Sequence, residues 1–158
     1  MSAEAAQVIT PEAFLAHWQG HRRLTRRIIE AFPDDQLFAF TLAGMRSFGE
    51  MAREMIGIAV PMVRGVVTGE WDTTVDRSPL PKEELLRLWD ESTEELDRLW
   101  AEIPLERFGE TMTAFGLYPG RASDLLLYAV DNEIHHRGQG FVYLRALGIE
   151  PAPFYDRG

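Results

Sequence analysis

The residues best suited to chemistry lie near the C-terminal end of the chain, in the segment from Asn132 to Gly148. The segment opens with the polar run Asn-Glu-Ile-His-His-Arg-Gly-Gln, within a stretch whose apolar residues recur at helical spacing. Ionisable groups in an apolar setting are costly unless they are paired or bind a metal. The segment therefore predicts a site, either a metal site or a hydrogen-bonded polar cluster.

His136 is predicted to face the interior of this helix. Four apolar residues lie 7 and 11 positions before and after it and so share its side of a helix: Leu125, Ala129, Tyr143 and Leu147. Asn132 lies one turn before His136, at the i, i+4 spacing at which two side chains converge. His135 is rotated by about 100° and is expected to face another helix or solvent. A core histidine hydrogen-bonded to Asn132 is the alternative to a metal ligand.

Glu54 is the matching feature on a second predicted helix, where it lies on or beside the apolar face. A carboxylate in that position needs a cation. Glu54 and His136 would give a divalent ion one oxygen and one nitrogen ligand, and Asn132 could add a weak carbonyl oxygen. Alternatively, Glu54 is a rim residue paired with Arg53 or Arg64.

His17 and His21 on the first predicted helix also have i, i+4 spacing. His21 falls within an apolar stripe and should point inward, whereas His17 lies toward its edge. His21 is either a core histidine or a further ligand that reaches a site shared with Glu54 and His136. The candidate metal ligands are therefore Glu54, His136, Asn132 and His21, and zinc, nickel and manganese are the candidate ions. No residue is assigned a catalytic role.

Composition limits the classes of function. The 158 residues fit one domain, taken as 1–158, with 25 acidic against 16 basic residues and a formal net charge of -9. This acidic balance argues against nucleic-acid binding, because phosphate contacts need clustered Lys and Arg. The chain has no cysteine, so any metal must be held by nitrogen and oxygen ligands.

No targeting or membrane segment is expected. Residues 1–7 lack the basic start and apolar region of a signal peptide, and no apolar run approaches the ~18 residues of a membrane span. A cytoplasmic protein without a membrane partner is the resulting expectation.

The elements that must position these side chains are four helices. Thr10 and Pro11 begin the first, Ser47 and Glu50 are spaced as a capping box for the second, and Gly148 is a natural stop for the fourth. The predicted ranges are about 11–31, 47–67, 81–101 and 121–147, with a kink at Pro61. The segment 103–120 is expected to form a short hairpin or an ordered loop. An all-α, antiparallel four-helix bundle is the predicted fold, because each amphipathic face then finds a partner.

These residues resemble the DinB/YfiT-like superfamily of metal-binding four-helix bundles. The resemblance covers nearly the whole chain and rests on four motifs: His17-Trp18 with Phe32-Pro33-Asp34-Asp35, the run Ser47 to Ala52, Gly69-Glu70-Trp71, and Glu133 to Gln139 followed by Tyr143-Leu144-Arg145. It implies a metal bound by three histidines, one from the second helix and an H-x-x-x-H pair from the fourth. Here His136 matches the last of these positions, while Asn132 and Glu54 occupy the other two, so the implied site is altered.

The resemblance also implies an activity. Some relatives resemble transferases that use a low-molecular-weight thiol, whose carboxylates Arg137 or Arg145 could bind. The first hypothesis is therefore a metal-dependent, thiol S-transferase-like enzyme acting on a small molecule. The second is a non-catalytic, stress-associated bundle that binds a small ligand or forms a dimer, with no metal. A homodimer is expected under both.

Overall fold

The computed structural model describes residues 8–72 and 75–158. Residues 1–7, on which the absence of a signal peptide was argued, lie outside the described residues. Four helices account for most of the chain: α1 (Pro11–Ala31), α2 (Phe48–Thr68), α3 (Lys82–Trp100) and α4 (Ala122–Ala146). Their bounds agree with the predicted ranges to within one residue at each end, which confirms the all-α prediction.

Local signals explain where the helices begin and end. The Thr10 hydroxyl accepts a hydrogen bond from the backbone of Ala13, and Ser47 and Glu50 form the expected capping box. Gly148 follows α4 with a φ of 79°, a left-handed conformation that glycine adopts without steric cost. Helix α2 continues through Pro61.

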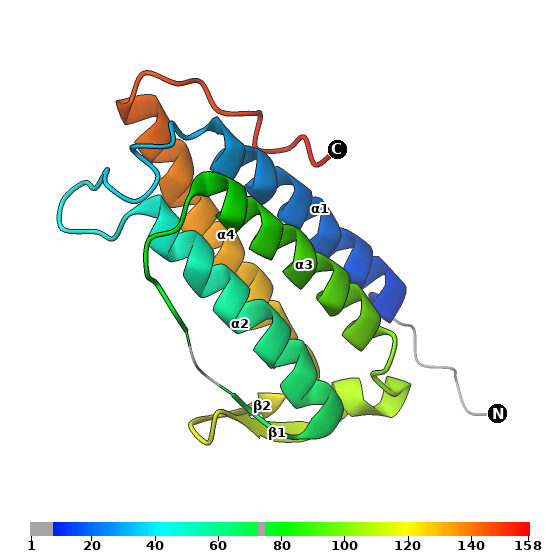
Figure 1. Cartoon of the computed structure of the whole chain (residues 1–158). Coiled ribbons are helices and arrows are strands. Elements are labelled where there is room, and N and C mark those ends of the chain that lie inside the picture. The colour runs from blue at the N-terminus through cyan, green and yellow to red at the C-terminus, as the bar shows by residue number, and fades with distance from the viewer. Residues whose placement is uncertain (1–7, 73–74) are drawn as a thin grey trace.

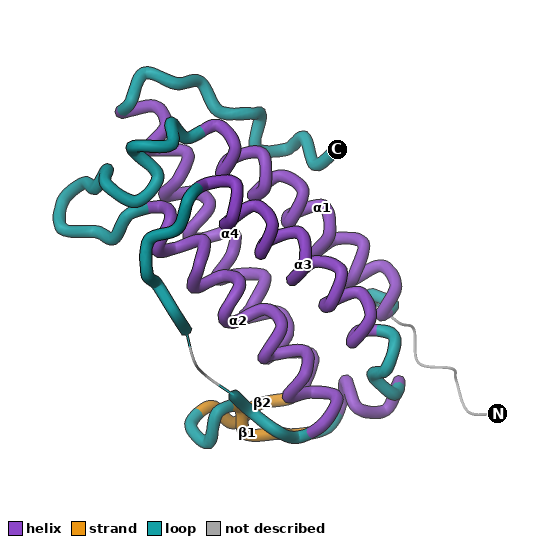
Figure 2. The backbone as a smooth tube through the Cα atoms, in the orientation of Figure 1, coloured by secondary structure: helices purple, strands orange, loops and turns teal. Residues whose placement is uncertain are grey.

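The helices form a bundle in which α2 and α3 run parallel (Figure 1). Contacts from Lys82 to the carbonyl of Phe32 and from Trp100 to that of Pro11 show that α1 and α3 are antiparallel. Helices α2 and α4 are also antiparallel. Residues 75–81 return along the bundle to the start of α3, so the predicted antiparallel arrangement does not hold for α2 with α3 or for α1 with α4 (Figure 2).

The segment before α4 contains a 3-10 turn, η1 (Leu105–Gly109), and an antiparallel hairpin of β1 (Thr111–Ala114) and β2 (Tyr118–Arg121). The structure thus decides for the hairpin, one of the two predicted alternatives for segment 103–120. Phe115 and Gly116 make its turn with positive φ values of 56° and 68°. The hairpin caps the end of the bundle at which α4 begins (Figure 1).

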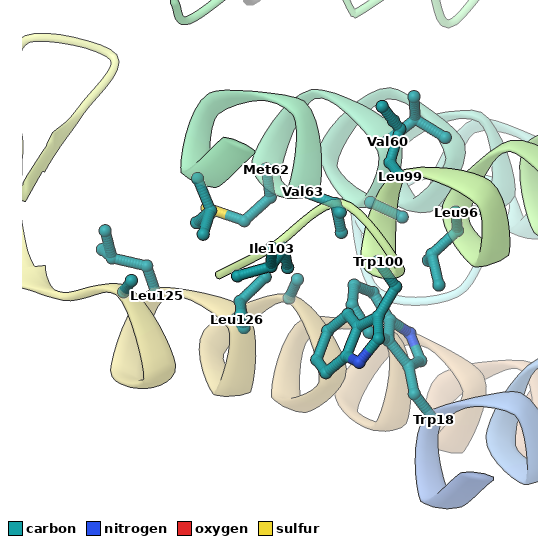
Figure 3. Close-up of a cluster of buried hydrophobic side chains, with 14 of the residues drawn as sticks. Trp18, Val60, Met62, Val63, Leu96, Leu99, Trp100, Ile103, Leu125 and Leu126 are labelled. Atoms are coloured by element: carbon teal, nitrogen blue, oxygen red, sulfur yellow. The ribbon is translucent and has the colours of Figure 1, made fainter. Parts of the chain in front are cut away.

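Two apolar clusters fill the bundle, one toward each end. The first packs Trp18, Val63 and Leu126 with residues near the hairpin (Figure 3), and the second packs Phe32, Phe48 and their neighbours at the other end. Along α1, α3 and α4, buried polar residues lie between the residues that join one cluster and those that join the other. They are His21, Arg22 and Thr25 on α1, Ser92 on α3, and Glu133, His136 and Arg137 on α4. The middle of the bundle is therefore a polar layer.

Candidate functional site

Glu54 and His136 meet across the α2–α4 interface. His136 Nε2 lies 3.3 Å from Glu54 Oε1, and the side chains of His136 and Glu54 are only 9% and 12% exposed, respectively. The antiparallel packing of the two helices brings these residues to the same level, 82 residues apart in sequence. Of the four predicted ligands, these are the two whose side chains are in direct contact.

A third residue orients the His136 ring. The Gln139 amide donates its Nε2–H to the sulfur of Met45 at 3.3 Å, which turns its Oε1 toward His136 Nδ1 at 2.8 Å. His136 therefore donates from Nδ1, and the neutral ring carries its lone pair on Nε2. That lone pair points at the Glu54 carboxylate, so the contact is attractive only when a proton or a metal cation lies between the two atoms.

Two arginines bind the other oxygen of Glu54. Arg77 donates to Oε2 at 2.9 Å, and Arg46 donates to the same atom. Burial alone would raise the pKa of Glu54, but the hydrogen bonds from Arg46 and Arg77 outweigh it and lower the pKa to about 2. Glu54 is thus ionised at neutral pH, with Oε1 left facing His136.

Asn132 lies one turn before His136 and is half-buried. Its Nδ2 is buried and has no hydrogen-bond partner among the described residues. The side-chain oxygen and nitrogen of an asparagine are distinguished only by their partners, so either atom can occupy this position. The expected Asn132–His136 hydrogen bond is absent from the contacts of His136, whose ring nitrogens face Gln139 and Glu54.

His21 belongs to a different cluster, between α1, α3 and α4. Its Nδ1 faces Arg137 Nη2 at 3.0 Å and its Nε2 faces His17 Nε2 at 3.1 Å. Because an arginine only donates, His21 must accept at Nδ1 and carry its proton on Nε2. Both ring nitrogens are engaged, which leaves no lone pair for a metal shared with Glu54 and His136. Of the two alternatives given for His21, a core histidine or a further metal ligand, the structure agrees with the core histidine.

Glu133 is the anion of this second cluster, which we call the buried network (Arg22, His21, Thr25, Glu133 and Arg137). It accepts hydrogen bonds from Thr25 at 2.7 Å and from Trp18 at 3.2 Å, and lies 3.8 Å from Arg22 Nη1. Arg22 also stacks on Trp89, 4.1 Å from the ring centroid.

Arg137 donates into α1, to the His21 carbonyl at 3.2 Å. It is only 5% exposed, so it does not present its guanidinium to a ligand at the surface. The interpretation of Arg137 as a thiol-binding residue is therefore wrong. Burial lowers the pKa of both arginines of the network, and Glu133 opposes that shift.

Sequence reasoning missed three residues of the site and proposed two wrong partners. Arg53 pairs with Asp76 and Arg64 with Glu95, so neither neutralises Glu54. The actual partners are Arg46 and Arg77, which no helical spacing signals. Gln139 follows His136 at i, i+3, a local spacing from which its contact could have been predicted.

Glu54 Oε1 and His136 Nε2 fit two positions in the coordination shell of a metal ion. With metal–ligand distances of about 2.0–2.2 Å, neighbouring ligand atoms lie roughly 3–3.5 Å apart, and the Glu54–His136 distance of 3.3 Å agrees with that. Within residues 8–72 and 75–158, however, no group of three or more His, Asp or Glu side chains is arranged around one point. Two shallow hollows lie by the start of α1 and η1, and Glu54, Asn132 and His136 do not line them.

The comparison with known families decides the identity of the fold. The model of the DinB family matches residues 1–158. The chain belongs to the DinB family.

None of the helices in the described ranges is long and apolar enough to cross a bilayer.

Individual relatives of this DinB chain agree with that assignment. The uncharacterized protein YjoA of Bacillus subtilis is 29% identical, over 90% of this chain and 94% of its own. Its crystal structure superposes with a TM-score of 0.74 at 22% identity, covering 90% of this chain and 97% of YjoA, and a DinB-like protein from Bacillus cereus also gives 0.74, at 20% identity over 91% and 97%. A mycothiol-dependent maleylpyruvate isomerase superposes with a TM-score of 0.62 at 17% identity, covering 82% of this chain and 60% of that enzyme.

Proposed function

We propose that this DinB-family chain binds a divalent metal ion through Glu54 Oε1 and His136 Nε2. The observation that carries the proposal is the 3.3 Å distance between His136 Nε2 and Glu54 Oε1. A neutral His136 that donates Nδ1–H to Gln139 presents a lone pair to that carboxylate, and two electron-rich atoms at that distance call for a cation. Gln139 supports it, because its Oε1 accepts the N–H of the other ring nitrogen, Nδ1, an arrangement typical of metal-binding histidines. Asn132 would add a side-chain oxygen if its amide is turned toward the site.

We further propose thiol-dependent transfer to a small molecule as the reaction. The support is the fold shared with the mycothiol-dependent isomerase. The sulfur would come from the small thiol, since the chain itself has no cysteine. A divalent metal supplies Lewis acidity that favours the thiolate form of such a thiol. Arg46 and Arg77, 37% and 43% exposed beside Glu54, carry the positive charge that would hold the carboxylates of an acidic thiol or substrate.

A second function is favoured by the same two arginines. Arg46 and Arg77 already compensate the charge of Glu54, so the carboxylate needs no metal for charge balance, and its contact with His136 can be a hydrogen bond within the protein. The chain would then be a metal-free bundle that binds a small anionic ligand.

Metal content distinguishes the two functions. Protein purified without chelator and dialysed against zinc, nickel or manganese should hold about one equivalent by elemental analysis, as expected for one site. The variants Glu54→Gln and His136→Ala should lose the metal, and His135→Ala, which removes the exposed neighbouring histidine, should retain it. Less than about a tenth of an equivalent in the unmodified protein would overturn metal binding and leave the second function.

The thiol reaction is tested on the metal-loaded protein with a panel of low-molecular-weight thiols and an aryl chloride as acceptor, following the release of chloride. Arg77→Ala should raise the KM for a carboxylate-bearing thiol more than that for an uncharged thiol. Full metal occupancy without any thiol-dependent turnover would remove the transferase proposal while leaving the metal site in place.

A further inference from the structure

The outward face of α4 carries an apolar stripe that no element of the described chain covers. Its apolar members Leu127, Ile134 and Val142 are 43%, 38% and 56% exposed. Asp131, Gly138 and Arg145 lie on the same stripe and are also exposed. At 100° per residue, the six positions fall within an arc of about 80°, a width typical of one helix–helix contact. We call this surface the α4 stripe.

Gly138 lies in the middle of the α4 stripe. Glycine in a helix interior costs about 1 kcal/mol relative to alanine, so the fold must gain from it or tolerate that cost. Gly140, two residues later, is explained by packing, because a Cβ there would lie 2.5 Å from the ring of Phe48. A Cβ on Gly138 would meet nothing within 4 Å in the described chain. Its small size therefore has no explanation inside one copy of the bundle.

The charges of the stripe are placed symmetrically about Gly138. Asp131 lies seven residues before it and Arg145 seven residues after it. Neither has an ion pair or side-chain hydrogen bond within the described part of the chain, whereas most other arginines of the protein are paired. The apolar residues repeat the pattern, with Ile134 four residues before Gly138 and Val142 four residues after it.

We propose that a second copy of this chain packs on the α4 stripe, with the two α4 helices antiparallel about a two-fold axis at Gly138. In such a pair each residue faces the one equally far on the other side of Gly138, because a two-fold interface is self-complementary. Asp131 then faces the partner's Arg145, and Ile134 faces the partner's Val142, each contact occurring twice. Gly138 faces itself, where its missing side chain lets the helix backbones approach closely.

Charge reversal tests the register. Sedimentation equilibrium or light scattering should show a dimer of the full chain. Asp131→Arg sets two guanidinium groups opposite each other at both ends of the contact and should raise the dimer Kd at least about tenfold. The double variant Asp131→Arg with Arg145→Asp restores opposite charges and should return the Kd to within about threefold of the unmodified protein. Glu94→Arg, an exposed charge reversal on α3, is the matched control and should leave the Kd unchanged.

The axis is tested at Gly138 itself. Gly138→Leu has room within one copy, so it should keep its helical circular dichroism while becoming monomeric. Since the chain has no cysteine, Gly138→Cys should form a disulfide-linked dimer on mild oxidation at low concentration, and Glu94→Cys should not. A protein that stays monomeric at about 100 μM, or a double charge variant as weak as the single one, would overturn the proposal.

Discussion

His136 and Arg137 are neighbours in sequence, yet they belong to two polar clusters with different properties. Arg137 belongs to the buried network on the α1 side. Its guanidinium donates to the His21 carbonyl, the Thr25 hydroxyl and His21 Nδ1. His136 faces α2, where it aims a ring nitrogen at Glu54 beside two half-exposed arginines. A rotation of about 100° along α4 separates the two environments.

The difference separates a structural role from a functional one. The buried network surrounds Glu133 with partners inside the protein, so the charge of this carboxylate is compensated without any ligand. The Glu54–His136 pair still requires a proton or a metal between its two atoms and lies against groups that reach solvent. The internally paired groups of the buried network therefore serve the fold, whereas a carboxylate and an imidazole nitrogen that face each other beside exposed arginines are suited to binding.

The largest expected effect comes from removing the anion of the buried network. Glu133→Ala leaves Arg22 and Arg137 buried without a countercharge and should lower the free energy of unfolding by about 3–5 kcal/mol. Glu54→Ala, the matched change in the other cluster, frees arginines that water can solvate and should cost less than about 1 kcal/mol. Urea unfolding followed by circular dichroism measures the free energy of unfolding of both variants. Equal losses would contradict the distinction between a structural and a functional cluster.

A smaller effect is expected on mild acidification. Burial, followed by the charges of Arg137, Arg157 and His17, lowers the pKa of His21 from its ordinary 6.5 to about 3. Below 6.5 the unfolded chain takes up a proton that folded His21 refuses, so this part of the stability is complete above 6.5 and is lost as the pH falls toward 3. The loss should reach about 2 kcal/mol by about pH 5.

His21→Asn isolates this contribution. The variant keeps an oxygen acceptor for Arg137 and removes the titrating ring, so its unfolding free energy should fall less steeply between pH 6.5 and about 5. Parallel curves for the two proteins would show that His21 is not the acid-sensitive group of the buried network.

The smallest effect on the fold is expected at Gln139, which contacts His136 and so acts on the Glu54–His136 pair alone. Gln139→Leu removes the acceptor for His136 Nδ1–H and should weaken metal binding about tenfold, while the free energy of unfolding changes by less than about 1 kcal/mol. Gln139→Glu keeps an acceptor oxygen and should preserve the affinity in a zinc competition titration. Equal affinities of the two variants would exclude an orienting role for Gln139.

Much of the local structure followed from the sequence. Helix ends were predictable to within a residue because caps such as Ser47 with Glu50 act over three or four positions. The inward direction of His21 and His136 and the outward direction of His135 were also predictable, since the angle of a side chain around a helix depends only on its position in that helix. The DinB motifs gave the family by the same local signals.

The partners of those side chains were not predictable in the same way. Arg77 reaches Glu54 from the long connection after α2, and Arg46 reaches it from before the Ser47 cap, so no helical periodicity relates either arginine to the carboxylate. The wrong choices of Arg53 and Arg64 came from looking only within α2. Gln139 is the exception, because its contact with His136 is made within one turn.

The sequence by itself determined the four helices, their polar positions and the family. Only the tertiary structure decided that His136 faces Glu54 while His21 and Arg137 face each other in a separate network. The physical reason is the path of the chain between helices. The connection after Gly69 makes α2 parallel to α3, and this path sets which helix lies on each side of α4, whereas the angle of a residue around its own helix is a local property.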